Sequence, residues 1–298
     1  MDKNKVAILD EILKRVAPYM SNTVSKQKAL FKEPWEINFS HALEKVFGAD
    51  KDKLENAVKG YVRFALDATR LQKKFEKTRQ YDHKSYEEAA TAVYHNENYM
   101  NNLYLPGIFL SHFLWPHHYQ QLQFFVNHFK PLVLAKENPQ FCDIGVGTGF
   151  YSCQMLKISE QVNGNAFDIS QSSLNYSKMQ IKAFGYENRW GFENRDIILQ
   201  TPERQWDFLL SVEVLEHLEN PVIFLKSLRK MLKKGGYGFI SAAVTAANED
   251  HIYLYNTILE VADQLNEAGF TIVKFQEDKA YEAKGDEPVP RNVAFIVT

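Results

Sequence analysis

Residues 141–152, FCDIGVGTGFYS, constrain the fold of this chain more than any other segment. A short apolar run ends at Asp143, and three glycines follow at alternate positions, Gly145, Gly147 and Gly149. Glycine reaches positive φ and lets the backbone approach a ligand closely. A glycine turn between a buried strand and a helix is typical of an open α/β sheet, in which ligands bind beyond the carboxyl ends of the strands. We therefore expect a parallel sheet with a ligand site at this turn.

The chain after Pro139 alternates short apolar strands with helices. Helices are expected in the gaps between the first five strands, and this alternation predicts a doubly wound, mostly parallel sheet. The helix that starts at Asn220 and Pro221 is expected to stop at Gly235 and Gly236. A charged loop, EDKAYEAKGDEPVPR, joins the last two strands and leaves them free to pair antiparallel at one edge. The predicted strands are 141–144, 165–168, 190–193, 206–212, 237–243, 270–276 and 292–297.

The first 130 residues read as helices. Apolar residues recur with a period near 3.6 over 52–78, which predicts one long helix. Ser85 and Glu88 have the spacing of a capping box. Breaks are expected at Gly48 and at the Glu33–Pro34 step. A helix over 117–129 is expected to begin after Pro116 and to end at Pro131.

Charge and histidine content also separate the two parts of the chain. Residues 1–130 contain 19 Lys and Arg against 15 Asp and Glu, and the rest contains 16 against 22. Seven of the nine histidines precede residue 131. We predict a helical region, 1–130, which covers the substrate or forms a homodimer, and a sheet domain, 131–298.

Composition excludes several classes of protein. A net charge of −2 disfavours general attraction to nucleic acid or membrane surfaces. No apolar run reaches the ~18 residues of a membrane span, and the charged N-terminus lacks the pattern of a signal peptide. The only two cysteines, Cys142 and Cys153, fit core positions in a reducing compartment. A cytoplasmic location is therefore expected.

The spacing of the glycines argues against two common phosphate-binding loops. It is G-x-G-x-G, whereas dinucleotide enzymes have G-x-G-x-x-G and phosphate loops end in a lysine. Asp143 would repel a pyrophosphate and would suit a cationic ligand. Asp168, at the end of the second strand, can accept hydrogen bonds from two ribose hydroxyls. Asp196, after the third strand, could accept from an exocyclic amine, and Glu213 follows the fourth strand.

This ordered set of motifs resembles the class I S-adenosylmethionine-dependent methyltransferases over about residues 139–298. DIGVGTG resembles the first motif, whose glycines and Asp143 meet the methionine part of the cofactor. FDIS, with Asp168 and Ile169, resembles the ribose motif, and RDI resembles the adenine contact through Asp196 and Ile197. WDFLLSVEVLEHL resembles the fourth strand, with Glu213 near the methionine end of the cofactor. The resemblance implies a Rossmann-like sheet of seven strands, with the last strand antiparallel.

Structural roles remain as alternatives for each of these residues. In the alternative, Asp143 and Asp168 serve only as helix caps, and Asp196 serves only as the cap of a turn. Glu213 could be a solvated loop carboxylate.

The aromatic-rich segment 94–129 precedes the sheet and contains five of the nine histidines. Aromatic walls with a few polar groups suit a small-molecule pocket, and the polar candidates are Tyr104, His112, His117 and His118. The alternative is that these side chains only pack the helices on the sheet or on a second subunit. His251 follows the fifth strand, at the same edge as the glycine loop. A general base is needed if the accepting atom must lose a proton, and the candidates are His251, His117 and His118, in that order.

The sequence therefore predicts an S-adenosylmethionine-dependent enzyme that moves a methyl group to a small metabolite by direct in-line displacement. The alternatives are methylation of a protein side chain and a non-catalytic cofactor-binding partner subunit. No residue is assigned as a metal ligand, because there is no tight H-x-x-x-H cluster. Asp250 and His251, with either His217 or the pair His117 and His118, could still bind a metal, which would favour C-methylation of an enolisable acid. His217 is otherwise assigned a structural role.

Overall fold

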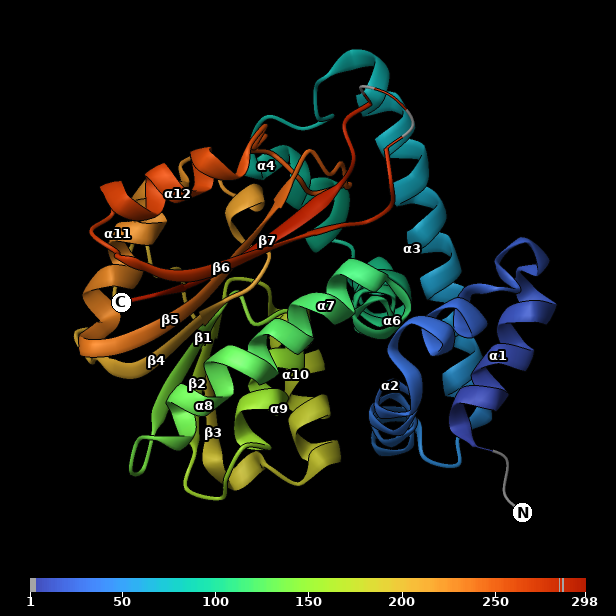
Figure 1. Cartoon of the computed structure of the whole chain (residues 1–298), viewed down its shortest axis with the longest axis horizontal. Helices are drawn as coiled ribbons and strands as arrows, with labels where there is room; N and C mark the ends of the chain where they lie inside the picture. The colour runs from blue at the N-terminus through green and yellow to red at the C-terminus, as the bar shows by residue number, and fades with distance from the viewer. Residues whose placement is uncertain (1–3, 284, 286) are drawn as a thin grey trace.

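A computed structural model describes residues 4–283, 285 and 287–298 of the chain. Its centre is a seven-stranded sheet of strand order β3-β2-β1-β4-β5-β7-β6 (Figure 1). The strands are β1 (Gln140–Ile144), β2 (Asn163–Asp168), β3 (Trp190–Asn194), β4 (Trp206–Ser211), β5 (Leu232–Val244), β6 (Ile272–Lys279) and β7 (Arg291–Val297). All seven predicted strands are therefore present.

The direction of the strands confirms the expected architecture. β1 to β5 pair in parallel, and β7 pairs antiparallel with both β5 and β6. β7 therefore lies between two strands that precede it, which is the seven-stranded, doubly wound arrangement that the motifs implied. Lys284 and Asp286 of the charged loop between β6 and β7 lie outside the described residues.

Alternation along the strands separates two apolar layers. In β7, Val293, Phe295 and Val297 face one core, and Ala294 and Ile296 face the other. A strand with both faces buried is expected when helices cover both faces of the sheet. The sheet face that carries Val293 packs against α11 (Pro221–Met231) and α12 (Ile258–Glu267). The opposite face packs against α9 (Phe150–Leu156) and α10 (Gln171–Phe184). Both cysteines are free and buried in these layers.

Two predictions about the connections are wrong. Residues 195–205, all of which the structure describes, contain turns instead of a helix between β3 and β4. Helix α11 ends at Met231 rather than at Gly235 and Gly236, because β5 begins at the next residue. The two glycines lie inside β5, where its register against β4 shifts, and a Cβ on Gly236 would lie 2.6 Å from the carbonyl oxygen of Asp207.

The N-terminal part is helical, as predicted, and stands beside the sheet (Figure 1). Its elements include three single π-helical turns, which interrupt the shorter helices. The elements are α1 (Lys5–Val16), η1 (Pro18–Met20), α2 (Thr23–Phe47), α3 (Lys51–Thr78), α4 (Tyr86–Ala89), η2 (Ala90–Tyr94), α5 (Glu97–Tyr99), η3 (Met100–Tyr104), α6 (Leu105–Leu114), α7 (Pro116–Phe124), η4 (Phe125–Phe129) and α8 (Lys130–Leu134). The sheet part also contains two short 3₁₀ helices, η5 (Glu187–Arg189) and η6 (Leu215–His217).

Local signals in this region were mostly interpreted correctly. Helix α3 matches the predicted long helix, Gly48 ends α2 at a φ of 51°, and Ser85 caps α4 by accepting from the backbone N–H of Glu88. The break expected at the Glu33–Pro34 step is a kink at Lys32, whose φ is 63°. Pro131 does not end the helix before it, because it lies in the first turn of α8, where a missing N–H removes no helical hydrogen bond.

One continuous apolar core joins the helical region to the sheet. It extends from Val6 in α1 to Ile296 in β7, and helices α7, η4 and α8 cover part of the same sheet face as α9. Phe125 and Phe129 contact Phe239 of β5 with ring centroids 5.3 and 5.5 Å apart. The helical region is thus held against one face of the sheet. Within the described residues, every helix is too short or too polar to span a bilayer.

Candidate functional site

A cavity of about 1130 Å³ lies between the carboxyl edge of the sheet and the helical region. Its volume exceeds the ~300–1,000 Å³ of a typical small-molecule pocket, so two ligands can be held together. The walls come from the glycine loop and the loops after β2, β4 and β5 on one side, and from α2, α3, α6 and α7 on the other. The predicted residues Asp143, Asp168, Glu213, His117 and His251 all line this cavity.

The three glycines of the loop have positive φ, but they serve different purposes. A Cβ on Gly145 would lie 2.6 Å from Val214, and one on Gly149 would lie 2.8 Å from Ser177, so both positions are kept small by packing. At Gly147 a Cβ would meet only one backbone oxygen, 3.9 Å away, and this residue lines the cavity. Bare backbone at Gly147 therefore faces the cavity, which is the cradle expected for a closely bound ligand.

Two carboxylates flank this loop, that of Asp143, which is buried, and that of Asp168, which is partly buried. Asp143 accepts a hydrogen bond of 2.7 Å from the Ser152 hydroxyl, and burial raises the pKa of Asp143 to about 7. Asp168 ends β2 and accepts from the backbone N–H groups of Gly147, at 3.1 Å, and Ser170, at 2.8 Å. Burial also raises the pKa of Asp168, to about 6. Burying a carboxylate is costly, and a cationic ligand or hydroxyl donors would offset that cost.

Glu213 follows β4 in a strained conformation, with a φ of 54°. Its backbone N–H donates to the Ser241 hydroxyl, which donates in turn to the Glu213 carboxylate at 2.6 Å. This reciprocal pair holds the side chain at the cavity, and burial raises the pKa of Glu213 to about 7. Positive φ at a non-glycine residue costs of order 1–3 kcal/mol and is most often retained at functional sites.

Asp196 and Ile197, the residues predicted to contact adenine, lie outside the lining of this cavity. The Asp196 carboxylate accepts from the backbone N–H groups of Ile198 and Leu199, and Ile197 packs in the core beside α11. Neither Asp196 nor Ile197 lines the cavity, whereas Ile169 does and is 45% exposed. The turn-capping role of Asp196 is thus present, and its contact with adenine stays a prediction.

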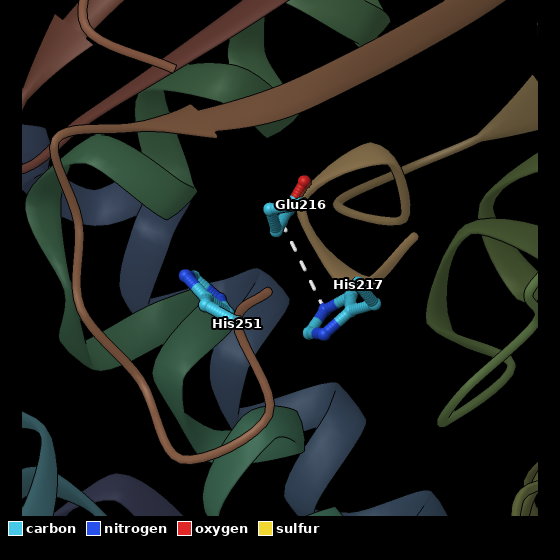
Figure 2. Close-up of side chains that lie close together, drawn as sticks. All are labelled: Glu216, His217 and His251. Carbon is cyan, nitrogen blue, oxygen red and sulfur yellow. Dashed lines mark ion pairs between the residues drawn. The ribbon is translucent and has the colours of Figure 1, made fainter. Parts of the chain in front are cut away.

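Glu216, His217 and His251 form a compact cluster at the cavity wall (Figure 2). One potential ligand atom from each residue lies within 4.8 Å of the others. Both oxygens of the buried Glu216 carboxylate lack a hydrogen-bond partner among the described residues. His217 Nε2 lies 3.9 Å from Oε1 of this carboxylate. Burial and the charge of Glu213 raise the pKa of Glu216 well above its usual value.

Backbone carbonyls fix the tautomers of both histidines. His251 Nδ1 lies 2.7 Å from the carbonyl oxygen of Ala246, and His217 Nδ1 lies 3.0 Å from that of Asp250. A carbonyl can only accept, so Nδ1 carries the proton and Nε2 keeps a lone pair in each neutral ring. Burial, with a smaller effect of His217, lowers the pKa of His251 to about 4, so His251 is neutral at pH 7.

Asp250 contacts this cluster but does not line the cavity. Its carboxylate accepts from the hydroxyls of Tyr94, at 2.7 Å, and Tyr104, and it lies 3.3 Å from His217 Nδ1. Tyr94 and Tyr104 each end a π-helical turn, a type of irregularity that is frequent at functional sites. The nearby histidines hold the pKa of Asp250 below its usual value despite its burial. Asp250 therefore orients His217 and does not face the cavity itself.

His117 and His118 lie at the opposite, helical end of the cavity, with His112. All three are enclosed by aromatic rings, and burial lowers their pKa values, to about 3 for His112 and His117. The Ser111 hydroxyl lies 2.9 Å from His118 Nδ1. The structure therefore places His251 near the carboxylates, and His117 and His118 in an uncharged environment.

The sequence interpretation did not single out several residues that line this cavity, including Glu216 and Gln27. Glu216 stands three positions after Glu213 and directly before His217, and this spacing of two carboxylates and a histidine was a usable signal. Gln27 of α2 also lines the cavity, but nothing in the local sequence distinguishes it from a surface glutamine.

Comparisons with known proteins agree with this geometry. Residues 135–284 match the sequence profile of a family described as a methyltransferase domain. The chain is 28% identical over 102 residues to a ubiquinone biosynthesis O-methyltransferase of Shewanella pealeana, covering 34% of this chain and 42% of that protein. It is 24% identical over 133 residues to the protein of the same name in Nitrosomonas europaea, covering 45% and 54%. The chain thus spans about half the length, or less, of these curated relatives.

A solved structure extends the likeness of fold to the helical region. A protein assigned as an O-methyltransferase from Nostoc punctiforme superposes with a TM-score of 0.53 at 12% identity. The superposition covers 81% of this chain and 72% of that one.

Proposed function

The chain belongs to the family of class I S-adenosylmethionine-dependent methyltransferases, and from this premise we propose that it methylates a small molecule held in the cavity. The cofactor of this family is S-adenosylmethionine, and the residues of this chain fit it. Gly147 offers bare backbone, Asp168 offers carboxylate oxygens to the ribose hydroxyls, and Asp143 and Glu213 offer negative charge to the amino-acid end. The single observation that supports a small substrate is that helices α2, α3, α6 and α7 wall the cavity opposite these residues.

The cofactor supplies a methyl group on a sulfonium centre, and the electron pair of the broken C–S bond remains on sulfur as a neutral thioether. The protein has to align the accepting atom and exclude water, and such positioning contributes ~7–11 kcal/mol. An accepting hydroxyl must also lose its proton as the new O–C bond forms. The neutral His251 has a lone pair on Nε2 and lines the cavity, so it is the residue that we assign to take that proton. The O-methyltransferase names of the relatives support oxygen as the acceptor.

A direct experiment separates small from macromolecular substrates. The protein is incubated with methyl-labelled cofactor and either the low-molecular-mass fraction or the protein fraction of a cell extract. We expect label to enter the low-molecular-mass fraction, and a His251→Ala variant to lower this rate by ~10²–10⁴-fold while cofactor affinity is kept. Label only in the protein fraction would favour side-chain methylation, and tight cofactor binding without turnover would favour a non-catalytic subunit.

The cluster in Figure 2 supports a second candidate, in which a divalent cation assists the transfer. Two imidazole nitrogens and one carboxylate form a ligand set known from metal sites. The other nitrogen of each imidazole is hydrogen-bonded to a backbone carbonyl, as is usual for metal-binding histidines. Separations of up to 4.8 Å exceed the ~3.4 Å between ligands of a bound ion, so the side chains would have to move inward. A cation there would neutralise Glu216 and lower the pKa of an oxygen acceptor.

The two candidates differ in what His251 does, because a nitrogen bound to a metal cannot accept a proton. Chelator-treated protein is titrated by calorimetry with Zn²⁺, Mn²⁺ and Mg²⁺ separately, and the nitrogen ligands favour Zn²⁺ or Mn²⁺ over Mg²⁺. Binding that is lost in Glu216→Gln but kept in Glu203→Gln, an exposed control, would support the metal-assisted reaction. Full turnover in the presence of chelator would exclude it and leave His251 as the base.

A further inference from the structure

The helical end of the cavity contains a buried amide oxygen without a partner. Gln27 of α2 is 3% exposed, and its Nε2 donates a hydrogen bond of 2.8 Å to the backbone carbonyl of Leu114. This bond fixes the orientation of the amide, because a flipped amide would place two oxygens against each other. The Oε1 atom of Gln27 then has no hydrogen-bond partner among the described residues, although the side chain lines the cavity.

Two further unpartnered polar atoms lie nearby on α7. His117, three residues after Leu114, is 6% exposed, and its Nδ1 has no partner within the described part of the chain. Gln121, one helical turn later, donates from Nε2 to the Tyr151 hydroxyl at 3.3 Å and leaves its Oε1 unpaired. Because Leu114 anchors Gln27 at the junction of α6 and α7, the three groups share one part of the cavity wall.

Aromatic rings form the wall between these polar atoms. Trp115 stacks on Phe64, with centroids 5.3 Å apart at 21°, and on His117, with centroids 5.5 Å apart at 20°. Tyr61 completes this wall and is 1% exposed. The charged residues that α2 and α3 contribute to the lining are Lys26, which is exposed and directly precedes Gln27, and Lys73 and Glu76, which lie farther along α3.

Unpaired buried polar groups are costly, and a ligand that pairs with them recovers that cost. We propose that this helical end binds an uncharged aromatic substrate with at least two hydrogen-bond donors, which pair with the oxygens of Gln27 and Gln121 and with Nδ1 of His117. The inference rests on the proposed function and adds to it the chemical class of the methyl acceptor. A charged group would be disfavoured beside Gln27, His117 and Gln121, because these buried side chains offer it no ion pair.

Matched probes test the hydrogen-bond donors separately from the ring. Binding of 2,7-dihydroxynaphthalene, 2,7-dimethoxynaphthalene and naphthalene-2,7-disulfonate is measured by calorimetry in the presence of S-adenosylhomocysteine and a chelator. The chelator excludes metal-mediated binding. We expect the dihydroxy compound to bind at least ~10-fold more tightly than the dimethoxy compound, and the disulfonate to bind most weakly.

Variants then assign the effect to the named residues. Gln27→Leu and Gln121→Leu should each reduce the advantage of the dihydroxy probe several-fold, whereas Gln171→Leu, an exposed glutamine on α10, should leave it unchanged. Affinity for S-adenosylhomocysteine is measured for every variant, which checks folding at the same time.

The outcomes separate this inference from the proposed function. Equal binding of the dihydroxy and dimethoxy probes would show that water pairs with these atoms, and would overturn the inference, as would tighter binding of the disulfonate or no binding of any probe. In each of these cases intact binding of S-adenosylhomocysteine leaves the proposed function in place. Loss of cofactor binding in the unaltered protein would instead refute the proposed function.

Discussion

The two ends of the cavity differ in charge, although they enclose one continuous space. The strand end presents the carboxylates of Asp143, Asp168, Glu213 and Glu216. The helical end presents glutamine amides, neutral histidines and aromatic rings. A cationic cofactor suits the first environment and an uncharged acceptor suits the second. Each predicted role can therefore be tested by asking whether a change at one end leaves the other end intact.

The largest effect is expected at Asp168. Its carboxylate holds the Gly147 N–H, and two ribose hydroxyls are predicted to donate to it. Hydrogen bonds to a charged group contribute ~1.5–3 kcal/mol each, so Asp168→Ala should weaken cofactor binding by ~10²–10⁴-fold. Calorimetry with S-adenosylhomocysteine measures this change. Normal affinity in Asp168→Ala would refute the ribose role, and unchanged affinity of the naphthalene probe would show that the helical end is intact.

Gly147→Ala should lower cofactor affinity by roughly 100-fold, or ~2.7 kcal/mol, because its Cβ would enter the cavity. Gly185→Ala is the matched control. Gly185 has a φ of 79°, compared with 52° for Gly147, and open space surrounds its Cβ position. Both variants should lose ~1–2 kcal/mol of unfolding free energy through backbone strain, and only Gly147→Ala should also lose cofactor affinity. Equal affinities in the two variants would mean that the cofactor does not approach this backbone.

Cofactor affinity should fall about tenfold or more from about pH 8 to about pH 6, because Asp143 and Glu213, with pKa values of about 7, become protonated and lose their attraction for a cation. Probe binding at the helical end should change little over this range. Asp143→Asn should bind cofactor more weakly at pH 8 and show a flatter pH profile. A profile as steep as that of the unaltered protein would remove Asp143 from the site.

Asp143→Asn should lower cofactor affinity at pH 8 but should raise the stability of the protein at the same pH. The pKa of Asp143 is raised from 3.8 to about 7 on folding, so the unfolded chain releases this proton more readily. The stabilising contribution is complete at low pH and is lost as pH rises through about 7. Asp143→Asn should therefore raise the thermal midpoint by several degrees at pH 8, and by less at pH 5, as a thermal melt at each pH would show.

Asp196→Ala should have the smallest effect on cofactor affinity, about threefold to tenfold, because Asp196 lies outside the cavity lining and any contact with adenine would be exposed. The loss of two turn-capping hydrogen bonds should cost ~1 kcal/mol of unfolding free energy. A loss of affinity as large as that of Asp168→Ala would show that the cofactor site extends beyond this cavity.

Sequence analysis identified more of the cavity residues at the strand end than at the helical end. At the strand end, Asp143, Gly147, Asp168 and Glu213 were identified because strand ends are periodic and the glycine spacing is local. At the helical end, His117 was identified only as a member of an aromatic segment, and Gln27 was missed. Gln27 faces the cavity because of its bond to Leu114, 87 residues away, and no local pattern encodes such a contact.

The sequence by itself determined the number of strands and their positions along the chain, the long helix α3 and the glycine loop, because these depend on local periodicity and on the conformational freedom of glycine. Tertiary structure alone decided which glycine has open space at its Cβ position, because packing against Val214 and Ser177 crowds that position at the other two. It also decided that Glu216, rather than Asp250, joins the two histidines. The physical reason is that burial and hydrogen bonding among distant segments, not residue type, determine which polar groups remain unpaired.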